Sequence, residues 1–177
     1  MIKLAVMNVL EQCVSYEIFC EGERFGNSSS VELPEMNFKT QTISGAGIAG
    51  EYDAPTLGSL ESCEIKITFR ALYKKVTQLM KQRAVQLSMR GVVQQYDSGT
   101  GTLKPLPIRI DARGRVKSFA PGKFEPSELM DSELTFEADV LSVKVNNVEE
   151  MLIDKLNFIY RVDGTDYLAE VRTALGI

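Results

Sequence analysis

The sequence contains no histidine and no tryptophan, and only three of its 177 residues are cysteine. Without histidine there is no imidazole to act as a general base, a zinc ligand or the partner of a nucleophilic serine. Cys13, Cys20 and Cys63 form no CxxC pair, so we interpret them as small hydrophobic residues, reduced in a bacterial-type cytoplasm. These absences argue against an enzyme and predict no catalytic residue, no metal site and no cofactor.

Long apolar runs and an excess of basic residues are also missing. No stretch reaches the roughly 18 apolar residues of a membrane span, and the apolar run near Met1 is too short for a signal peptide. We therefore expect no membrane insertion. Lys and Arg total 20 against 24 for Asp and Glu, a net charge of −4 that argues against a dedicated nucleic-acid binder. The length predicts a single domain over residues 1–177.

Alternation of apolar and polar residues is the dominant pattern, and it is clearest in Ser132–Val145. A period of two predicts a strand that is buried on one face and wet on the other. We expect the core face to carry Leu134, Phe136, Ala138 and Val140. The opposite face carries Glu133, Thr135, Glu137 and Asp139. The three carboxylates are interpreted as a solvated strand face rather than as a metal site.

Weaker alternation predicts further strands, two of them flanking the glycine-containing turn Ser98–Gly101. These strands are Val14–Cys20, Arg24–Lys39, Cys63–Phe69, Val85–Tyr96, Pro107–Phe119 and Met151–Val162. Helical spacing predicts a helix over Ala71–Arg83 and a C-terminal helix that Thr165 caps and Gly176 ends. The fold class is mainly β (α+β): an antiparallel β-sandwich or barrel-like domain with one flanking helix and a C-terminal helix.

The segment Thr40–Ser59 does not follow this pattern, because it is rich in glycine and small residues. Its GAGIAG, Gly45–Gly50, matches the GxGxxG spelling of dinucleotide sites, but Pro55 prevents the helix that such a site requires. We therefore predict a long flexible loop, residues 40–59. Such loops on a β scaffold commonly carry recognition.

The segment Asp154–Ile177 resembles the end of the major tail tube proteins of contractile-tailed phages and R-type bacteriocins. That family ends with an Asn-containing segment, a V-D/N-G turn and an LAE-x-R-x-ALG helix. The matching residues are Asn157, Val162, Asp163, Gly164, Leu168, Ala169, Glu170, Arg172, Ala174, Leu175, Gly176 and Ile177. Looser matches are the GE-x-F turn at Gly22–Phe25, the V-x-L-P-x-M segment at Val31–Met36, and Arg90-Gly91.

The resemblance implies a structural protein of the virion tail or bacteriocin particle, assembled in the bacterial cytoplasm. Family members form hexameric rings that stack into the hollow inner tube of a contractile tail, each subunit adding four strands to a ring-wide barrel. The implied partners are other copies of the chain, the tail sheath protein, and the tape measure, baseplate and tail terminator proteins. DNA would pass transiently and without sequence specificity in a phage, and effectors would pass in other systems.

On this basis we assign candidate residues to three surfaces. The inter-subunit assembly loop would use Thr40, Ile43, Gly45, Gly47, Ile48, Gly50, Glu51 and Tyr52. A polar, mostly acidic lumen would be lined by Glu64, Lys66, Glu133, Thr135, Glu137 and Asp139. The sheath would contact Tyr167, Glu170 and Arg172. Arg109, Arg113 and Arg115 either pair with the acidic strand face or point elsewhere.

Two other classes stay open at this point. A type VI secretion-like tube protein would share the ring architecture. A monomeric β-barrel that binds a small ligand would instead need a closed barrel with an apolar interior.

Overall fold

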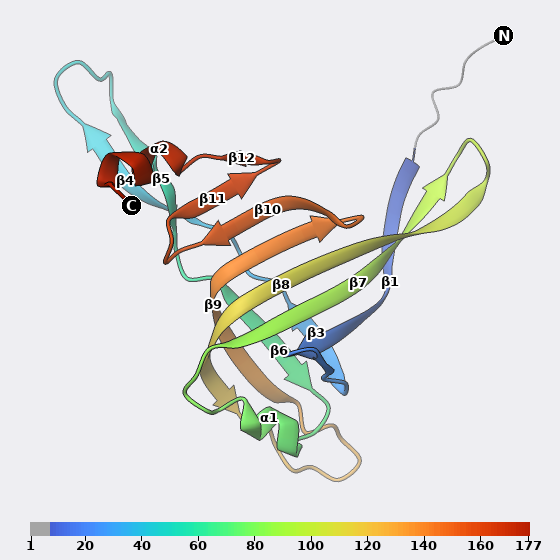
Figure 1. The fold of residues 1–177 in the computed structure, drawn as a ribbon. Helices are drawn as coiled ribbons and strands as arrows, with labels where there is room; N and C mark the ends of the chain where they lie inside the picture. Colours follow the sequence, from blue (N-terminus) through green and yellow to red (C-terminus); the bar gives the residue numbers. More distant parts are fainter. Residues whose placement is uncertain (1–7) are drawn as a thin grey trace.

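Ten of the strands belong to one antiparallel sheet, which the computed structural model describes within residues 8–177 (Figure 1). The strands are β1 (Asn8–Cys20), β2 (Glu23–Arg24), β3 (Ser28–Glu32), β4 (Phe38–Ser44), β5 (Glu51–Leu60), β6 (Glu64–Phe69), β7 (Val85–Asp97), β8 (Thr102–Ala120), β9 (Ser132–Val145), β10 (Val148–Asp154), β11 (Ile159–Val162) and β12 (Thr165–Asp166). The helices are α1 (Lys74–Gln78) and α2 (Ala169–Leu175). The mainly β architecture predicted from the sequence is confirmed.

The sheet forks at β9. Its first half, Ser132–Glu137, pairs with β6, and its second half, Val140–Val145, pairs with β10 on the same edge. The main path runs β12-β11-β10-β9-β8-β7-β1-β2, while β3 joins through β6. The fork folds one part of the sheet behind the other, so that their apolar faces enclose a core (Figure 1).

The core extends to the α1 end of the molecule, at the bottom of Figure 1. Phe69 and Phe136 are fully buried in it, and Phe25 packs edge-on against Phe69 at a centroid distance of 5.6 Å. Val76 of α1 is also fully buried and closes this end. Burial of side chains of this size stabilises the fold by roughly 1.5–3 kcal/mol each.

A β-bulge in β9 changes which residues of this strand face the core. Gly114 of β8 pairs with Ala138 and Arg113 pairs with Val140, so Asp139 is an extra residue. Leu134, Phe136 and Ala138 are buried as predicted, but beyond the bulge Leu141 takes the core position. The prediction that Val140 faces the core is therefore wrong, because one inserted residue reverses the alternation.

The predicted irregular loop at residues 40–59 is also wrong, since the structure forms a β4–β5 hairpin there. Thr40 lies opposite Pro55 and Ile43 opposite Tyr52, and the glycine-rich sequence is confined to the tip. The tip is bent where Gly45, Gly47 and Gly50 adopt positive φ, which costs glycine little. Pro55 is compatible with this two-stranded hairpin because its missing N–H can face away from β4.

Other predicted elements are broken by turns. Arg24–Lys39 is not one strand, because Pro34 lies in the coil between β3 and β4. Met151–Val162 is two strands of a hairpin, with Phe158 at φ 51° in the turn. The helix predicted over Ala71–Arg83 shortens to α1.

The C-terminal helix starts later than predicted. Thr165 belongs to β12, and the N–H of Leu168 at the start of α2 donates to Asp166 over 3.1 Å. Gly176 ends α2 in the left-handed conformation with φ 76°, as predicted.

Candidate assembly site

Four strands at the α1 end form a sheet whose two outer edges are unpaired within residues 8–177. Their order is β3-β6-β9-β8, and each neighbouring pair is antiparallel. β7 pairs with β8 only as far as Gly114, so Arg115–Ala120 pairs with β9 alone. β3 pairs with β6 alone. Unpaired strand edges present backbone donors and acceptors that can pair with another chain.

The outer face of this four-stranded sheet is polar. Glu64 lies directly opposite Glu137, Lys66 opposite Thr135, and Thr68 opposite Glu133, so these side chains share one face. The structure thus brings five of the six predicted lumen residues together. Asp139 lies at the bulge instead, between the paired residues Ala138 and Val140.

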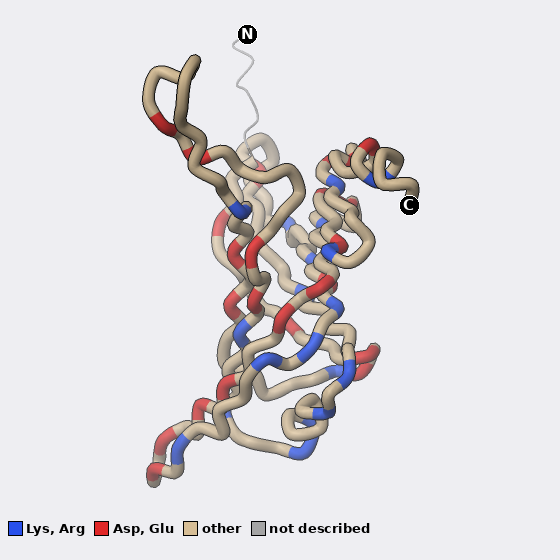
Figure 2. Tube along the Cα trace, turned by 90° about the vertical axis from the view of Figure 1, so that its left-hand side faces the viewer, with Lys and Arg blue, Asp and Glu red and all other residues tan. Residues whose placement is uncertain are grey.

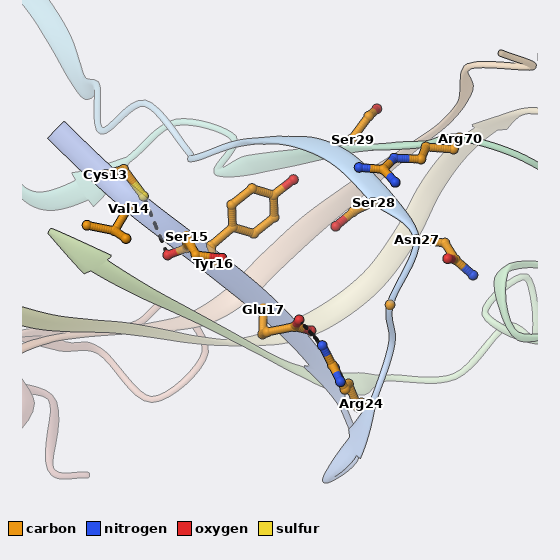
Figure 3. Close-up of a pocket in the computed structure, with 11 residues that line it drawn as sticks. Cys13, Val14, Ser15, Tyr16, Glu17, Arg24, Asn27, Ser28, Ser29 and Arg70 are labelled. Atoms are coloured by element: carbon orange, nitrogen blue, oxygen red, sulfur yellow. Dashed lines mark hydrogen bonds and ion pairs between the residues drawn. The ribbon is translucent and has the colours of Figure 1, made fainter. Parts of the chain in front are cut away.

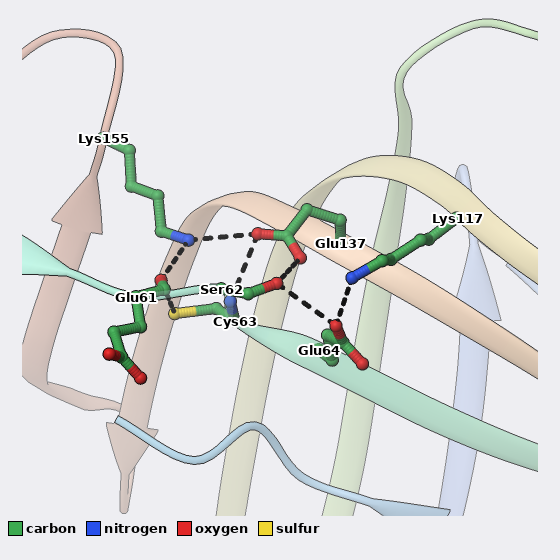
Figure 4. Close-up of polar contacts among 7 residues, drawn as sticks. All are labelled: Glu61, Ser62, Cys63, Glu64, Lys117, Glu137 and Lys155. Atoms are coloured by element: carbon green, nitrogen blue, oxygen red, sulfur yellow. Dashed lines mark hydrogen bonds and ion pairs between the residues drawn. The ribbon is translucent and has the colours of Figure 1, made fainter. Parts of the chain in front are cut away.

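Three lysines neutralise carboxylates on this face. Lys117 pairs with Glu64, and Lys155 pairs with Glu137 at 3.1 Å (Figure 4). Lys66 lies 3.7 Å from Glu32 of β3. Like charges directly opposite each other on neighbouring strands are destabilising, so the lysines offset the cost of placing Glu64 beside Glu137.

Glu137 is the most enclosed acid of this network. Burial raises the pKa of its carboxyl, but hydrogen bonds from Ser62, Lys155 and the backbone N–H of Cys63 outweigh burial and hold the pKa below its usual value. The pKa of Glu64 is lowered mainly by the hydrogen bond from Lys117. Both carboxylates are therefore charged at neutral pH.

A cleft of about 860 Å³ separates β1 from β3 (Figure 3). Its walls are Cys13–Glu17 of β1 and Gly26–Ser29 at the start of β3, with Arg70 beside them. β2 pairs only with the last two residues of β1, so most of this β1 edge has no partner within residues 8–177. The cleft therefore lies between two open strand edges.

The β4–β5 hairpin projects from the body at the end opposite α1. Figure 2 shows it on one side of this end, with the C-terminal helix on the other. Every residue of β4 is exposed. The hairpin contains every residue that the sequence analysis assigned to assembly.

The predicted sheath-contact residues differ in their surroundings. Tyr167 and Glu170 are exposed. Arg172 is half-buried and donates to the Asp166 carboxylate at 2.7 Å and to the Phe158 carbonyl at 2.6 Å. Arg172 therefore holds α2 against the preceding strands.

Neither Ser62 nor Lys155 was singled out from the sequence, although both bind Glu137. Lys155 is 18 positions away, in the β10–β11 turn, and the fork of the sheet brings it back to β9. No local pattern in the sequence signals this contact. Arg115, which the sequence left unassigned, lies directly opposite Glu137 on β8.

Residues 8–177 offer neither a metal-binding cluster nor a membrane-spanning helix. They contain no group of three or more Cys, Asp or Glu side chains placed to hold a metal ion. They also contain no helix that is both long and apolar enough to cross a membrane.

The chain is similar in sequence to two tail tube proteins of phages. The chain is 24% identical to the tail tube protein of Escherichia phage P2, over 99% of this chain and 97% of that protein. It is 22% identical to the major tail tube protein of Serratia phage KSP20, over 92% and 94% of the two chains.

A solved chain from the sheath/tube terminator of an extracellular contractile injection system has a similar fold. The TM-score is 0.53 at 12% identity, covering 74% of this chain and 94% of that chain. The model of the phage tail tube protein FII family matches residues 11–176. The chain therefore belongs to the phage tail tube protein FII family.

Proposed function

We propose that this protein forms stacked hexameric rings that build the hollow inner tube of a contractile tail. The observation that carries the proposal is the four-stranded sheet β3-β6-β9-β8 with two unpaired edges. Because all three pairs in it are antiparallel, β8 of one copy can pair antiparallel with β3 of the next. The strands of six copies then close into one ring-wide barrel, and heterologous contacts of this kind generate rings when the rotation closes.

The cleft between β1 and β3 leaves space for this pairing. The incoming segment is Arg115–Ala120 of the neighbouring copy, which would lie along Ser28–Glu32. Ring closure would satisfy backbone groups on both edges at once.

The polar face of the four-stranded sheet is then the wall of the bore. A barrel of about 24 strands is too wide to be filled by side chains, so its interior is aqueous. Glu64, Lys66 and Glu137 would contact this water, together with Glu133, whereas Thr135 lies on the same face but is only 7% exposed.

DNA would slide through such a bore without binding. Affinity for DNA comes chiefly from cations that replace the counterions of phosphates. Here Lys66, Lys117 and Lys155 are each paired with a glutamate of their own subunit, and Arg115 lies directly opposite Glu137. Their charges are therefore largely compensated before DNA arrives.

In this assembly the chain has a structural role in the virion tail. Its partners would be other copies in the ring and in adjacent rings, and the tail sheath, tape measure, baseplate and tail terminator proteins. Assembly would take place in the bacterial cytoplasm. The similarity to a sheath/tube terminator chain supports the tail context.

The test is assembly of the purified chain, followed by size-exclusion chromatography and negative-stain electron microscopy. We expect hexameric rings or hollow tubes from the natural sequence. The variant Ser29→Pro should remain folded but monomeric, because Ser29 lies at an irregularity of β3, where only its hydroxyl donates to the Thr68 carbonyl of β6, and a proline in an edge strand hinders pairing with another chain.

Ser29→Ala is the matched control, since it removes the hydroxyl but keeps the backbone N–H. This variant should still assemble. A natural chain that stays monomeric at every concentration would contradict the proposal and favour a solitary ligand-binding domain. Assembly of Ser29→Pro as efficient as that of Ser29→Ala would show that β3 is not the joining edge.

A further inference from the structure

The exposed β4–β5 hairpin has two chemically different faces. Ile43 lies directly opposite Tyr52, and Gln41 lies opposite Ala54, so these four side chains share one face. The other face carries Thr42 and Asp53, which are joined by a hydrogen bond of 2.6 Å, and the Ser44–Glu51 pair. Tyr52 is 53% exposed and Ile43 is 37% exposed. The hairpin therefore presents a small apolar face that its own subunit leaves in water.

A matching apolar surface lies on the inner face of β1, β7 and β8, beyond the core. It is a groove of about 250 Å³ lined by Tyr16, Val31, Leu33, Met89, Val93 and Ile108. Leu33 is 52% exposed. Cys13 also lines the groove, is exposed, and lies directly opposite Val93.

The hairpin and the groove lie on opposite sides of the subunit. In Figure 1 the hairpin leaves toward the upper left, whereas β1 and β3, which border the groove, lie on the right. The open edge of β8 lies on the hairpin side, and the open edge of β3 lies on the groove side. When β8 of one subunit pairs with β3 of its neighbour, the hairpin of the first subunit therefore lies on the side where the neighbour has its groove.

We propose that the apolar face of the β4–β5 hairpin docks in the β1–β7–β8 groove of the adjacent subunit within one ring. This inference rests on the proposed ring assembly and names a second contact in it. Ile43 and Tyr52 supply the apolar side chains, and Leu33 and Val93 receive them. The polar face, with Asp53 and Glu51, stays in water. Removing both apolar surfaces from water stabilises the ring.

The native Cys13 allows a direct test by cross-linking. In a Cys20→Ser background, Ala54→Cys places a thiol on the apolar face of the hairpin, whereas Asp53→Cys places one on the opposite face. Assembled samples are treated with a short bis-maleimide and separated on a denaturing gel. Electron microscopy of the same samples shows whether rings or tubes are present.

We expect a ladder from Ala54→Cys that ends at six subunits, because cross-links within one ring cannot exceed its copy number. The ladder should be lost in Asp53→Cys and in Ala54→Cys combined with Cys13→Ser.

Other outcomes overturn the inference in recognisable ways. Intact tubes without any ladder would show that the hairpin docks elsewhere, while the tube function stands. A ladder that continues beyond six would show docking between stacked rings. Absence of rings in every sample, including the natural sequence, would contradict the proposed function itself.

Discussion

Two hairpins of this protein share a simple local structure but differ in what supports them. β10–β11 continues the main sheet next to β9, and its Ile153 is only 2% exposed. β4–β5 forms a separate two-stranded sheet in which all of β4 is exposed. An isolated hairpin is marginally stable in water. The comparison teaches that one hairpin is supported by the fold of its own subunit, whereas the other is exposed and available for the assembly contact proposed above.

The base of β4–β5 is nevertheless fixed to the body. The ring of Phe38 packs edge-on against Tyr160 at 5.6 Å, and Leu60 is buried. Gly58 lies against the side chain of Leu168, which begins the C-terminal helical segment. The hairpin is therefore anchored at one end and free at the other.

The largest effect that separates the two hairpins should come from truncating one side chain in each. Ile153→Ala should lower the free energy of unfolding by about 2–5 kcal/mol, because it leaves a cavity in the core. Tyr52→Ala should change it by less than about 0.5 kcal/mol, because the side chain is exposed. Denaturant unfolding in the non-assembling Ser29→Pro background measures both. Equal losses would show that β4–β5 is supported by its own subunit.

A smaller effect should follow from Gly58→Ala, which tests the anchor. Gly58 has φ +63°, and an added Cβ would lie 2.5 Å from a methyl carbon of Leu168. Gly22→Ala is the matched control, since Gly22 has φ +86° with nothing within 4 Å. Backbone strain costs on the order of 1–3 kcal/mol at either site, so any extra loss at Gly58 reports the contact with Leu168.

Thermal unfolding and hydrogen exchange of α2 would measure the Gly58→Ala effect. We expect faster exchange in α2 for Gly58→Ala than for Gly22→Ala. Identical behaviour of the two variants would mean that the hairpin base does not hold the C-terminal segment.

The smallest effect should be a dependence on pH that involves Glu137, the carboxylate to which the β10–β11 turn is joined. Lys155 of that turn pairs with Glu137, whose pKa is held below its unfolded value of 4.5 by the balance of burial and hydrogen bonds. A lowered folded-state pKa stabilises the protein above pH 4.5, and this contribution is lost as the pH falls through the folded value.

The melting temperature of the Ser29→Pro monomer should therefore fall below about pH 4.5, and Glu137→Gln should make that fall shallower. Glu170→Gln, at an exposed position on α2, serves as the control. A Glu137→Gln profile parallel to that of the parent would contradict a stabilising role for this pair.

Strand identity could be predicted where the sequence alternates without interruption. β9 has the predicted bounds, and the burial of Leu134 and Phe136 follows from their period of two. The face of Val140 could not be predicted, because the bulge at Asp139 depends on pairing with β8, a partner distant in sequence.

The candidate site was predictable only in part for the same reason. The polar residues of β6 and β9 were identified from each strand alone, and their direct pairing makes one continuous face. The open edge of β8 depends on where β7 stops pairing, and that of β3 on its having β6 as its single partner, which no local pattern encodes. The sequence predicts a loop in place of the β4–β5 hairpin, because the glycines at the tip dominate the composition of the segment and the paired segments on either side are short.

The four-stranded sheet has a geometric consequence for the size of the proposed ring. Four is an even number, so strand directions alternate without a fault whether five, six or seven protomers join. Strand polarity is therefore indifferent to stoichiometry. The number of subunits in the ring must therefore depend on an angle, which is set by the twist of each sheet and by the tilt at each junction between subunits. Substitutions that alter this curvature are the ones that would widen or narrow the pore.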